Sequence, residues 1–271
     1  MRLAGAPISW GVCEVPGWGH QLPPSRVLAE MVALGLTASE LGPDGYLRPG
    51  LLEEYGLRPA GQFHPVVLHD PGHDPLPGLP DDVPGMLVLA AATGVDGYDA
   101  RPALDERGWD TLLANLDRVA AAYGPAAGLH PHVGTMVETR QEVARVLDGS
   151  AIPLCLDTGH LLIGGTDPAE LAVTHAARVA HVHLKDVDAA LAAQVTRAEL
   201  TYTQAVGKGL YRPLGQGDVD IAAIVAALGA SGYTGWYVME QDVILTGPHQ
   251  DPAADVSSSL AYLSELSGAV G

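Results

Sequence analysis

The sequence predicts one α/β domain, a (β/α)8 barrel, over residues 1–271. Eight short apolar runs alternate with longer segments of helical period, and no linker, repeat or low-complexity stretch breaks this alternation. A length of 271 residues suits a single barrel, and 47% hydrophobic residues suffice for its core. The alternative is a doubly wound open sheet, but Gly215–Gly217 is too short and comes too late to be the phosphate loop of that fold.

The apolar runs are rich in small and branched residues, and many are bounded by Gly or Pro, which is typical of buried parallel strands. We expect strands at Leu3–Trp10, Thr37–Leu41, Leu57–Phe63, Met86–Ala91, Ala127–His132, Ile152–Asp157, Arg178–Leu184 and Trp236–Gln241.

Capping residues and apolar spacing place helices between these runs. The expected helices are Arg26–Leu34 after Ser25, Trp109–Tyr123, Gln141–Leu147 after Thr139, Ala169–His175 after Asp167-Pro168, Ile221–Leu228 after Asp218 or Asp220, and Val256–Leu266. The stretch Asp70–Pro84 is rich in Pro and Gly and is predicted to be a long loop.

Composition limits the partners and the compartment. A formal net charge of −18 repels phosphate backbones and anionic membranes, so we expect no nucleic acid and no membrane as partner. No apolar run reaches the ~18 residues that span a bilayer, and Met1–Pro7 does not resemble a signal peptide. We interpret Cys13 and Cys155 as buried thiols of a cytoplasmic protein rather than as a disulfide. A homo-oligomer is compatible with the sequence.

Polar residues that can bind metals or move protons follow many of the predicted strands. In barrels of this kind the chemistry lies where strands end and loops begin. The residues at these ends are Trp10 with Glu14, Glu40, His64, Thr93, His130 with His132, Asp157, His183 with Lys185, and Glu240 with Asp242.

Three of these residues lie on successive late strands. Side chains alternate along a strand, and Asp157, His183 and Glu240 each share a face with apolar neighbours. If that face is the barrel interior, all three point into one mouth. A lone Asp at a strand end is more often a helix cap than a ligand. Together the three favour a site of nitrogen and oxygen ligands for Mn, Co, Mg or Zn.

Several motifs resemble those of xylose-isomerase-like TIM barrels: Ile152–His160, Val179–Asp186, Gly215–Ile221 and Tyr237–Asp242. A second group resembles the inosose dehydratases of inositol catabolism: Pro7–Trp10, Glu40–Gly42 with Gly45-Tyr46, and His130–Thr135. The resemblance covers nearly the whole chain. It implies a single divalent metal, Mn or Co first, with Mg and Zn as alternatives.

The same resemblance implies four metal ligands, which map onto Glu138, Asp157, His183 and Glu240, with His132 as the alternative to Glu138. Glu138 and Glu240 are the implied general acid and base, and His132 or His160 are the alternatives. The candidates for substrate contacts are Trp10, Glu40, His64, His130 and Lys185. For Trp10 the alternative is plain core, for His64 a surface loop, and for Lys185 an ion pair with Asp186.

The segment Val187–Pro213 is longer than an ordinary connection between a strand and a helix. It contains a predicted helix, Ala189–Leu200, and two aromatic residues, Tyr202 and Tyr211. We interpret it as a lid insertion that covers the mouth of the barrel. An ordinary surface excursion or a subunit contact is the alternative.

The expected reaction begins with metal-assisted removal of a proton next to a ketone. Loss of a β-hydroxyl from the enediolate would make the protein a lyase acting on a keto-cyclitol such as 2-keto-myo-inositol. Return of the proton to carbon would make it a ketose or keto-sugar isomerase or epimerase. In both cases the partner is a small polyol or keto-sugar. A DNA-repair endonuclease of the same superfamily conflicts with the charge of −18, and a non-catalytic sugar-binding barrel is the remaining alternative.

Overall fold

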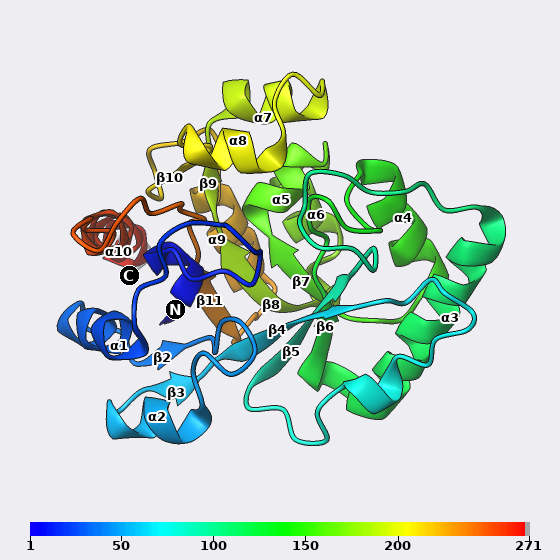
Figure 1. Ribbon diagram of the computed structural model, residues 1–271, viewed down its shortest axis with the longest axis horizontal. Coiled ribbons are helices and arrows are strands. Elements are labelled where there is room, and N and C mark those ends of the chain that lie inside the picture. Colours follow the sequence, from blue (N-terminus) through cyan, green and yellow to red (C-terminus); the bar gives the residue numbers. More distant parts are fainter. Residues whose placement is uncertain (269–271) are drawn as a thin grey trace.

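The computed structural model describes residues 1–268 and shows one parallel sheet surrounded by helices (Figure 1). The sheet has nine strands in the order β3-β2-β1-β11-β8-β7-β6-β5-β4. Their bounds are β1 Arg2–Gly5, β2 Ala38–Ser39, β3 Arg58–Pro59, β4 Gly61–Val66, β5 Met86–Ala91, β6 Ala127–Leu129, β7 Leu154–Asp157, β8 Val179–Leu184 and β11 Trp236–Met239.

The two ends of this sheet are joined through one residue. β3 and β4 are separated only by Ala60, whose N–H donates to the carbonyl of Ser39 and whose carbonyl accepts from the N–H of Met86. β3 and β4 therefore act as one bent strand that bridges β2 and β5. The sheet is thus a nearly closed barrel, which confirms the predicted (β/α)8 architecture and excludes the open sheet.

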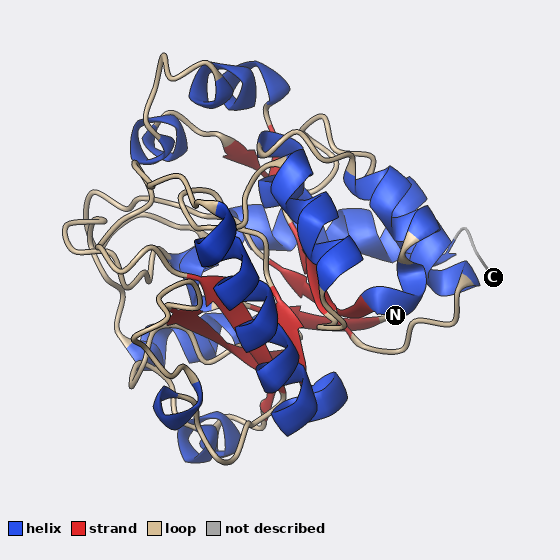
Figure 2. Cartoon of the chain, turned by 90° about the vertical axis from the view of Figure 1, so that its right-hand side faces the viewer, coloured by secondary structure: helices blue, strands red, loops and turns tan. Residues whose placement is uncertain are grey.

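Helices form the outer layer, as the side view shows (Figure 2). They are α1 Pro24–Ala33, α2 Pro49–Glu54, α3 Glu106–Tyr123, α4 Arg140–Gly149, α5 Thr158–Ile163, α6 Pro168–Thr174, α7 Ala189–Thr196, α8 Tyr202–Gly207, α9 Ile221–Ala230 and α10 Ala253–Gly268. Because helices cover the barrel, β5 is buried on both faces and Leu87–Ala91 is apolar throughout.

The predicted caps are confirmed in three cases. Thr139 forms a capping box with Glu142 at the start of α4, Asp167 caps α6, and Asp220 caps α9. The prediction for Ser25 is wrong, because α1 already begins at Pro24 without a side-chain cap. Proline has the backbone angle of a first helical residue and needs no N–H partner there.

The first predicted strand is too long. It ends at Gly5, and Pro7–Trp10 forms a 3-10 helix instead. Proline lacks an N–H, so it cannot donate to a neighbouring strand. The predicted loop Asp70–Pro84 is confirmed, with one short 3-10 turn at Leu76–Gly78.

The insertion, residues 187–213, forms a unit of its own at one end of the barrel. It carries α7 and α8, and a small antiparallel sheet of β9, Asp186–Val187, and β10, Tyr211–Arg212, lies at its two ends (Figure 1). Both cysteines are free thiols. Within residues 1–268, no helix has the length and apolar character to cross a membrane.

Candidate active site

Four side chains meet at the carboxyl end of the barrel. Asp157 ends β7 and pairs in register with His183 of β8, while His130 and Glu240 follow β6 and β11 directly. Each offers one ligand atom, and these atoms all lie within 4.8 Å of one another. The structure thus brings together the three residues that strand alternation pointed to, and adds His130. We call these four residues the metal cluster.

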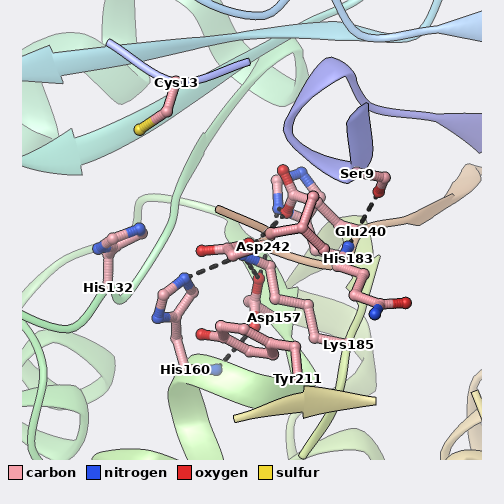
Figure 3. Close-up of polar contacts among 12 residues, drawn as sticks. Ser9, Cys13, His132, Asp157, His160, His183, Lys185, Tyr211, Glu240 and Asp242 are labelled. Atoms are coloured by element: carbon pink, nitrogen blue, oxygen red, sulfur yellow. Dashed lines mark hydrogen bonds and ion pairs between the residues drawn. The ribbon is translucent and has the colours of Figure 1, made fainter. Parts of the chain in front are cut away.

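The cluster leaves buried polar atoms without hydrogen-bond partners. His183 Nδ1 lies 2.8 Å from Glu240 Oε2 and 3.5 Å from Asp157 Oδ2, but none of the three atoms is placed for a hydrogen bond (Figure 3). Buried polar atoms are rarely left without partners. A divalent cation would satisfy all three at once, and carboxylate and imidazole groups are ligands that Mn, Co and Zn accept. The residues therefore fit a metal.

Asp157 is both a helix cap and a member of the cluster. Its Oδ1 accepts from the backbone N–H of His160 at 2.7 Å, which caps α5, and its Oδ2 faces the cluster. The helix cap uses one oxygen of this carboxylate and leaves the other free for the cluster.

Glu40 lies behind the cluster and orients His183. Its Oε1 accepts from His183 Nε2 at 2.9 Å and from His181 Nε2 at 2.7 Å. Burial alone would raise the pKa of Glu40, but the charge of His183 and the two hydrogen bonds hold this pKa far below its usual value. A carboxylate that binds one imidazole nitrogen fixes the other as the metal-facing one.

Lys185 extends the cluster with a buried cation. Its Nζ donates to Asp242 Oδ1 at 2.6 Å and lies 3.3 Å from Glu240 Oε2 and 3.1 Å from His160 Nε2. Burial alone would lower the pKa of Lys185, but Asp242, Glu240 and Asp157 hold it well above its usual value. Lys185 is thus paired with Asp242 and not with Asp186, which instead accepts from the backbone of Gly215, Gly217 and Val219.

His132 is a neutral imidazole on the wall of the same cavity. Its Nδ1 lies 2.7 Å from the carbonyl of Val133, which fixes the proton on Nδ1 and leaves Nε2 unprotonated. Burial and the charge of Lys185 lower the pKa of His132 to about 4. Its ring packs at a tilt against His160, at a centroid distance of 3.7 Å, and against Tyr98, at 4.3 Å.

A cavity of about 540 Å³, part of it open solvent, lies over these groups. The ionisable groups on its wall are Glu14, Glu40, His130, His132, Lys185, Glu240 and Asp242, and its aromatic wall is Trp18, Phe63 and Tyr98. Small polar molecules are held in such cavities by a few converging charged groups on an apolar wall.

Glu138, one of the four expected ligands, is not among the four residues of the metal cluster. Its Oε2 lies 3.1 Å from Arg101 Nε and accepts from the N–H of Gly134 at 2.8 Å. This ion pair holds the side chain away from the cluster. His130 is the fourth member of the cluster, and His132, the expected alternative to Glu138, converges with His130 and His160 in a neighbouring group.

Two expected substrate contacts lie away from the cavity. Trp10 is fully buried in the 3-10 helix after β1, and its indole donates to Glu30 at 2.8 Å. On β4, Phe63 lines the cavity and packs against His130 and His132, so His64, the next residue, faces the other side of the strand. The aromatic wall therefore consists of Trp18, Phe63 and Tyr98 and does not include Trp10.

The sequence patterns assign no role to Asp242, Tyr202 or Tyr98. The signal for Asp242 is its place among the polar residues that directly follow β11, which ends at Met239. Tyr202 and Tyr98 come from an insertion and a loop whose paths local periodicity does not define.

Comparisons with known proteins agree with this architecture. The family model described as "Xylose isomerase-like TIM barrel" matches residues 85–266. The chain is 32% identical to the inosose dehydratase of Geobacillus kaustophilus, over 93% of this chain and 88% of that protein. Among solved structures, an L-ribulose 3-epimerase superposes with a TM-score of 0.65 at 17% identity, over 98% of this chain and 94% of that one. The IOLI protein, solved with a zinc atom, gives a TM-score of 0.65 at 14% identity, over 98% of both chains.

The family match covers about two thirds of the chain, the relative of 32% identity covers nearly all of it, and the barrel closes as this fold requires. The chain therefore belongs to the xylose isomerase-like TIM barrel family.

Proposed function

We propose that this protein is a metal-dependent lyase that removes water from a keto-cyclitol of the 2-keto-myo-inositol kind. The observation that carries the proposal is the metal cluster of His130, Asp157, His183 and Glu240 beneath a cavity lined by Lys185 and His132. Similarity to an inosose dehydratase over 93% of the chain supports the choice of substrate.

The metal cluster would hold one divalent cation, and Mn or Co is our first choice. Glu40 would keep His183 oriented toward it. A cation in this place would act as a Lewis acid that polarises a substrate carbonyl and makes the neighbouring C–H more acidic.

His132 is the base that we propose for removing the proton. Its Nε2 is unprotonated at neutral pH, because Nδ1–H is held by the carbonyl of Val133 and the pKa is lowered to about 4. A base acts only within hydrogen-bond reach of its proton, and His132 lies on the cavity wall. The ammonium group of Lys185 would donate to a substrate oxygen that becomes negative during the reaction.

The departing hydroxyl needs a proton donor close to the cavity. We propose His160, whose Nε2 lies 3.1 Å from Lys185 Nζ and whose ring stacks on His132. We also propose that the insertion acts as a lid, because Tyr202 and Tyr211 are buried and aromatic contacts join Tyr202 to His132 and His160.

Return of the proton to carbon would give an isomerase or epimerase from the same first step. The likeness of the barrel to an L-ribulose 3-epimerase makes this the second candidate. The two functions differ only in whether a hydroxyl leaves.

The test is incubation of the protein with Mn(II) or Co(II) and a panel of keto-inositols and ketoses in deuterated water. We expect an enone-like absorbance with a keto-inositol, and its loss in Asp157→Asn, which keeps the shape of the side chain but not its charge. Deuterium uptake without the absorbance would support the isomerase or epimerase instead. Absence of both with every compound would contradict enzymatic enolisation.

A further inference from the structure

Tyr202 connects the insertion to the floor of the cavity. It is the first residue of α8, whose start is fixed by a capping box between Thr201 and Gln204. The side chain of Tyr202 is buried, and only 2% of the residue is exposed. Its hydroxyl donates to Asp242 Oδ2 at 2.5 Å.

Asp242 transmits this contact to Lys185. Its second oxygen, Oδ1, accepts from Lys185 Nζ at 2.6 Å (Figure 3). A single buried carboxylate therefore joins the insertion to the buried ammonium. A buried ion pair is favourable only when its remaining hydrogen-bonding positions are also satisfied. The phenol of Tyr202 provides this for Asp242.

We propose that Tyr202 is a positioning residue: by donating to Asp242 it holds the insertion closed and fixes Lys185 in the cavity. The inference deepens the proposed function and rests on it in one respect, the contact of Lys185 with substrate. Loss of the phenol hydroxyl would free Asp242 to turn, and Lys185 with it.

Tyr211 offers a matched control. Its hydroxyl bonds that of Tyr202 at 2.9 Å, and Lys185 Nζ lies 5.1 Å from its ring centre. Tyr211→Phe therefore removes one hydroxyl from the same pair and keeps both the ring and the bond between Tyr202 and Asp242. Tyr202→Phe removes the bond to Asp242.

The lysine content of the chain makes the orientation of Lys185 measurable. The sequence has only two lysines, Lys185 in the cavity and Lys208, exposed in the insertion. Brief acetylation of the whole protein with acetic anhydride, without substrate, followed by peptide mass spectrometry, gives the labelling rate of Lys185 relative to Lys208. Trypsin cleavage after the exposed Arg197 reports opening of the insertion in the same samples.

We expect Tyr202→Phe to raise the relative labelling of Lys185 and the cleavage after Arg197 by roughly tenfold, since a hydrogen bond to a charged group is lost. Tyr211→Phe should stay near the wild-type values, and Asp242→Asn should resemble Tyr202→Phe. Unchanged labelling in Tyr202→Phe, or an equal rise in Tyr211→Phe, would overturn the proposal. If Tyr202→Phe fails to fold, Tyr202→Leu, which also lacks the hydroxyl, is compared with Tyr211→Leu, and the same two outcomes decide.

Turnover separates this inference from the proposed function. If keto-cyclitols react, Tyr202→Phe should lower kcat/KM in the wild-type background but add nothing once Lys185→Met is present. A purely structural role of Tyr202 would reduce turnover in both backgrounds and would contradict positioning. If the wild-type protein turns over no keto-cyclitol, the proposed function fails, and the labelling result still decides the role of Tyr202.

Discussion

Single side chains in this site serve two neighbours at once. Asp157 caps α5 with one oxygen and offers the other to the metal cluster, and Glu40 binds two imidazoles through one oxygen. Substituting such a residue therefore changes both partners, so controls must be chosen from residues that lie nearby but outside the cluster.

Exchange of His130 and of Glu138 tests which residue completes the metal cluster. His130→Ala should weaken Co(II) binding strongly, because one of four converging ligand atoms is lost. Glu138→Gln should leave it nearly unchanged, because Glu138 is bound to Arg101 and Gly134. Isothermal titration with Co(II) measures the affinity of both variants. A large loss of affinity in Glu138→Gln would contradict a metal cluster without Glu138.

Glu40→Gln tests the orientation of His183. The amide keeps the size of the side chain but loses the charge that attracts the two imidazole N–H groups. Loss of such a supporting contact should lower metal affinity by roughly 10–100-fold. Glu30→Gln is the matched control. The Glu30 carboxylate accepts from the indole of Trp10 and is not part of the metal cluster. Equal affinities of Glu40→Gln and wild type would argue against this role.

At the scale of the strands, the period of the apolar residues predicts which strand faces point toward the candidate site. It does not predict where each strand ends. Asp157, His183 and Glu240 were found because alternation repeats along well-defined buried strands. The first strand stops early at Pro7, so Trp10 is turned into the core. Glu138 depends on Arg101, a partner distant in sequence that no local pattern reveals.

Adjacent residues of β4 provide a test of this alternation. Phe63→Ala should lower kcat/KM for the substrate, because the ring lines the cavity and supports His130 and His132. His64→Ala should leave kcat/KM within about twofold, because its side chain faces away and substitutions remote from a site have small effects. Steady-state kinetics give kcat/KM for both variants. An equal loss of kcat/KM in His64→Ala would show that His64, and not only Phe63, faces the cavity.

At the scale of the whole molecule, the buried histidines link stability to pH. His130, His132, His160 and His181 are buried and their pKa values are lowered, chiefly by burial. The unfolded chain binds protons to these groups below about pH 6.5, while the folded chain does not, so their contribution to stability is lost as the pH falls. The pKa of His183 is raised, so below pH 6.5 this residue is protonated in both the folded and the unfolded chain. It therefore does not offset the loss of stability that the other four histidines cause.

The metal-free protein should therefore unfold at progressively lower temperature between pH 6.5 and 4.5. Each such histidine costs about 1.4 kcal/mol per pH unit in this range. Glu40 and Glu240, whose pKa values are lowered, add to the loss only below the usual glutamate pKa of 4.5. Thermal unfolding at several pH values measures the slope, and His132→Gln should flatten it because glutamine takes up no proton. A midpoint that stays constant down to pH 5 would mean that the histidines are already charged in the folded protein, and His132 could then not serve as the base.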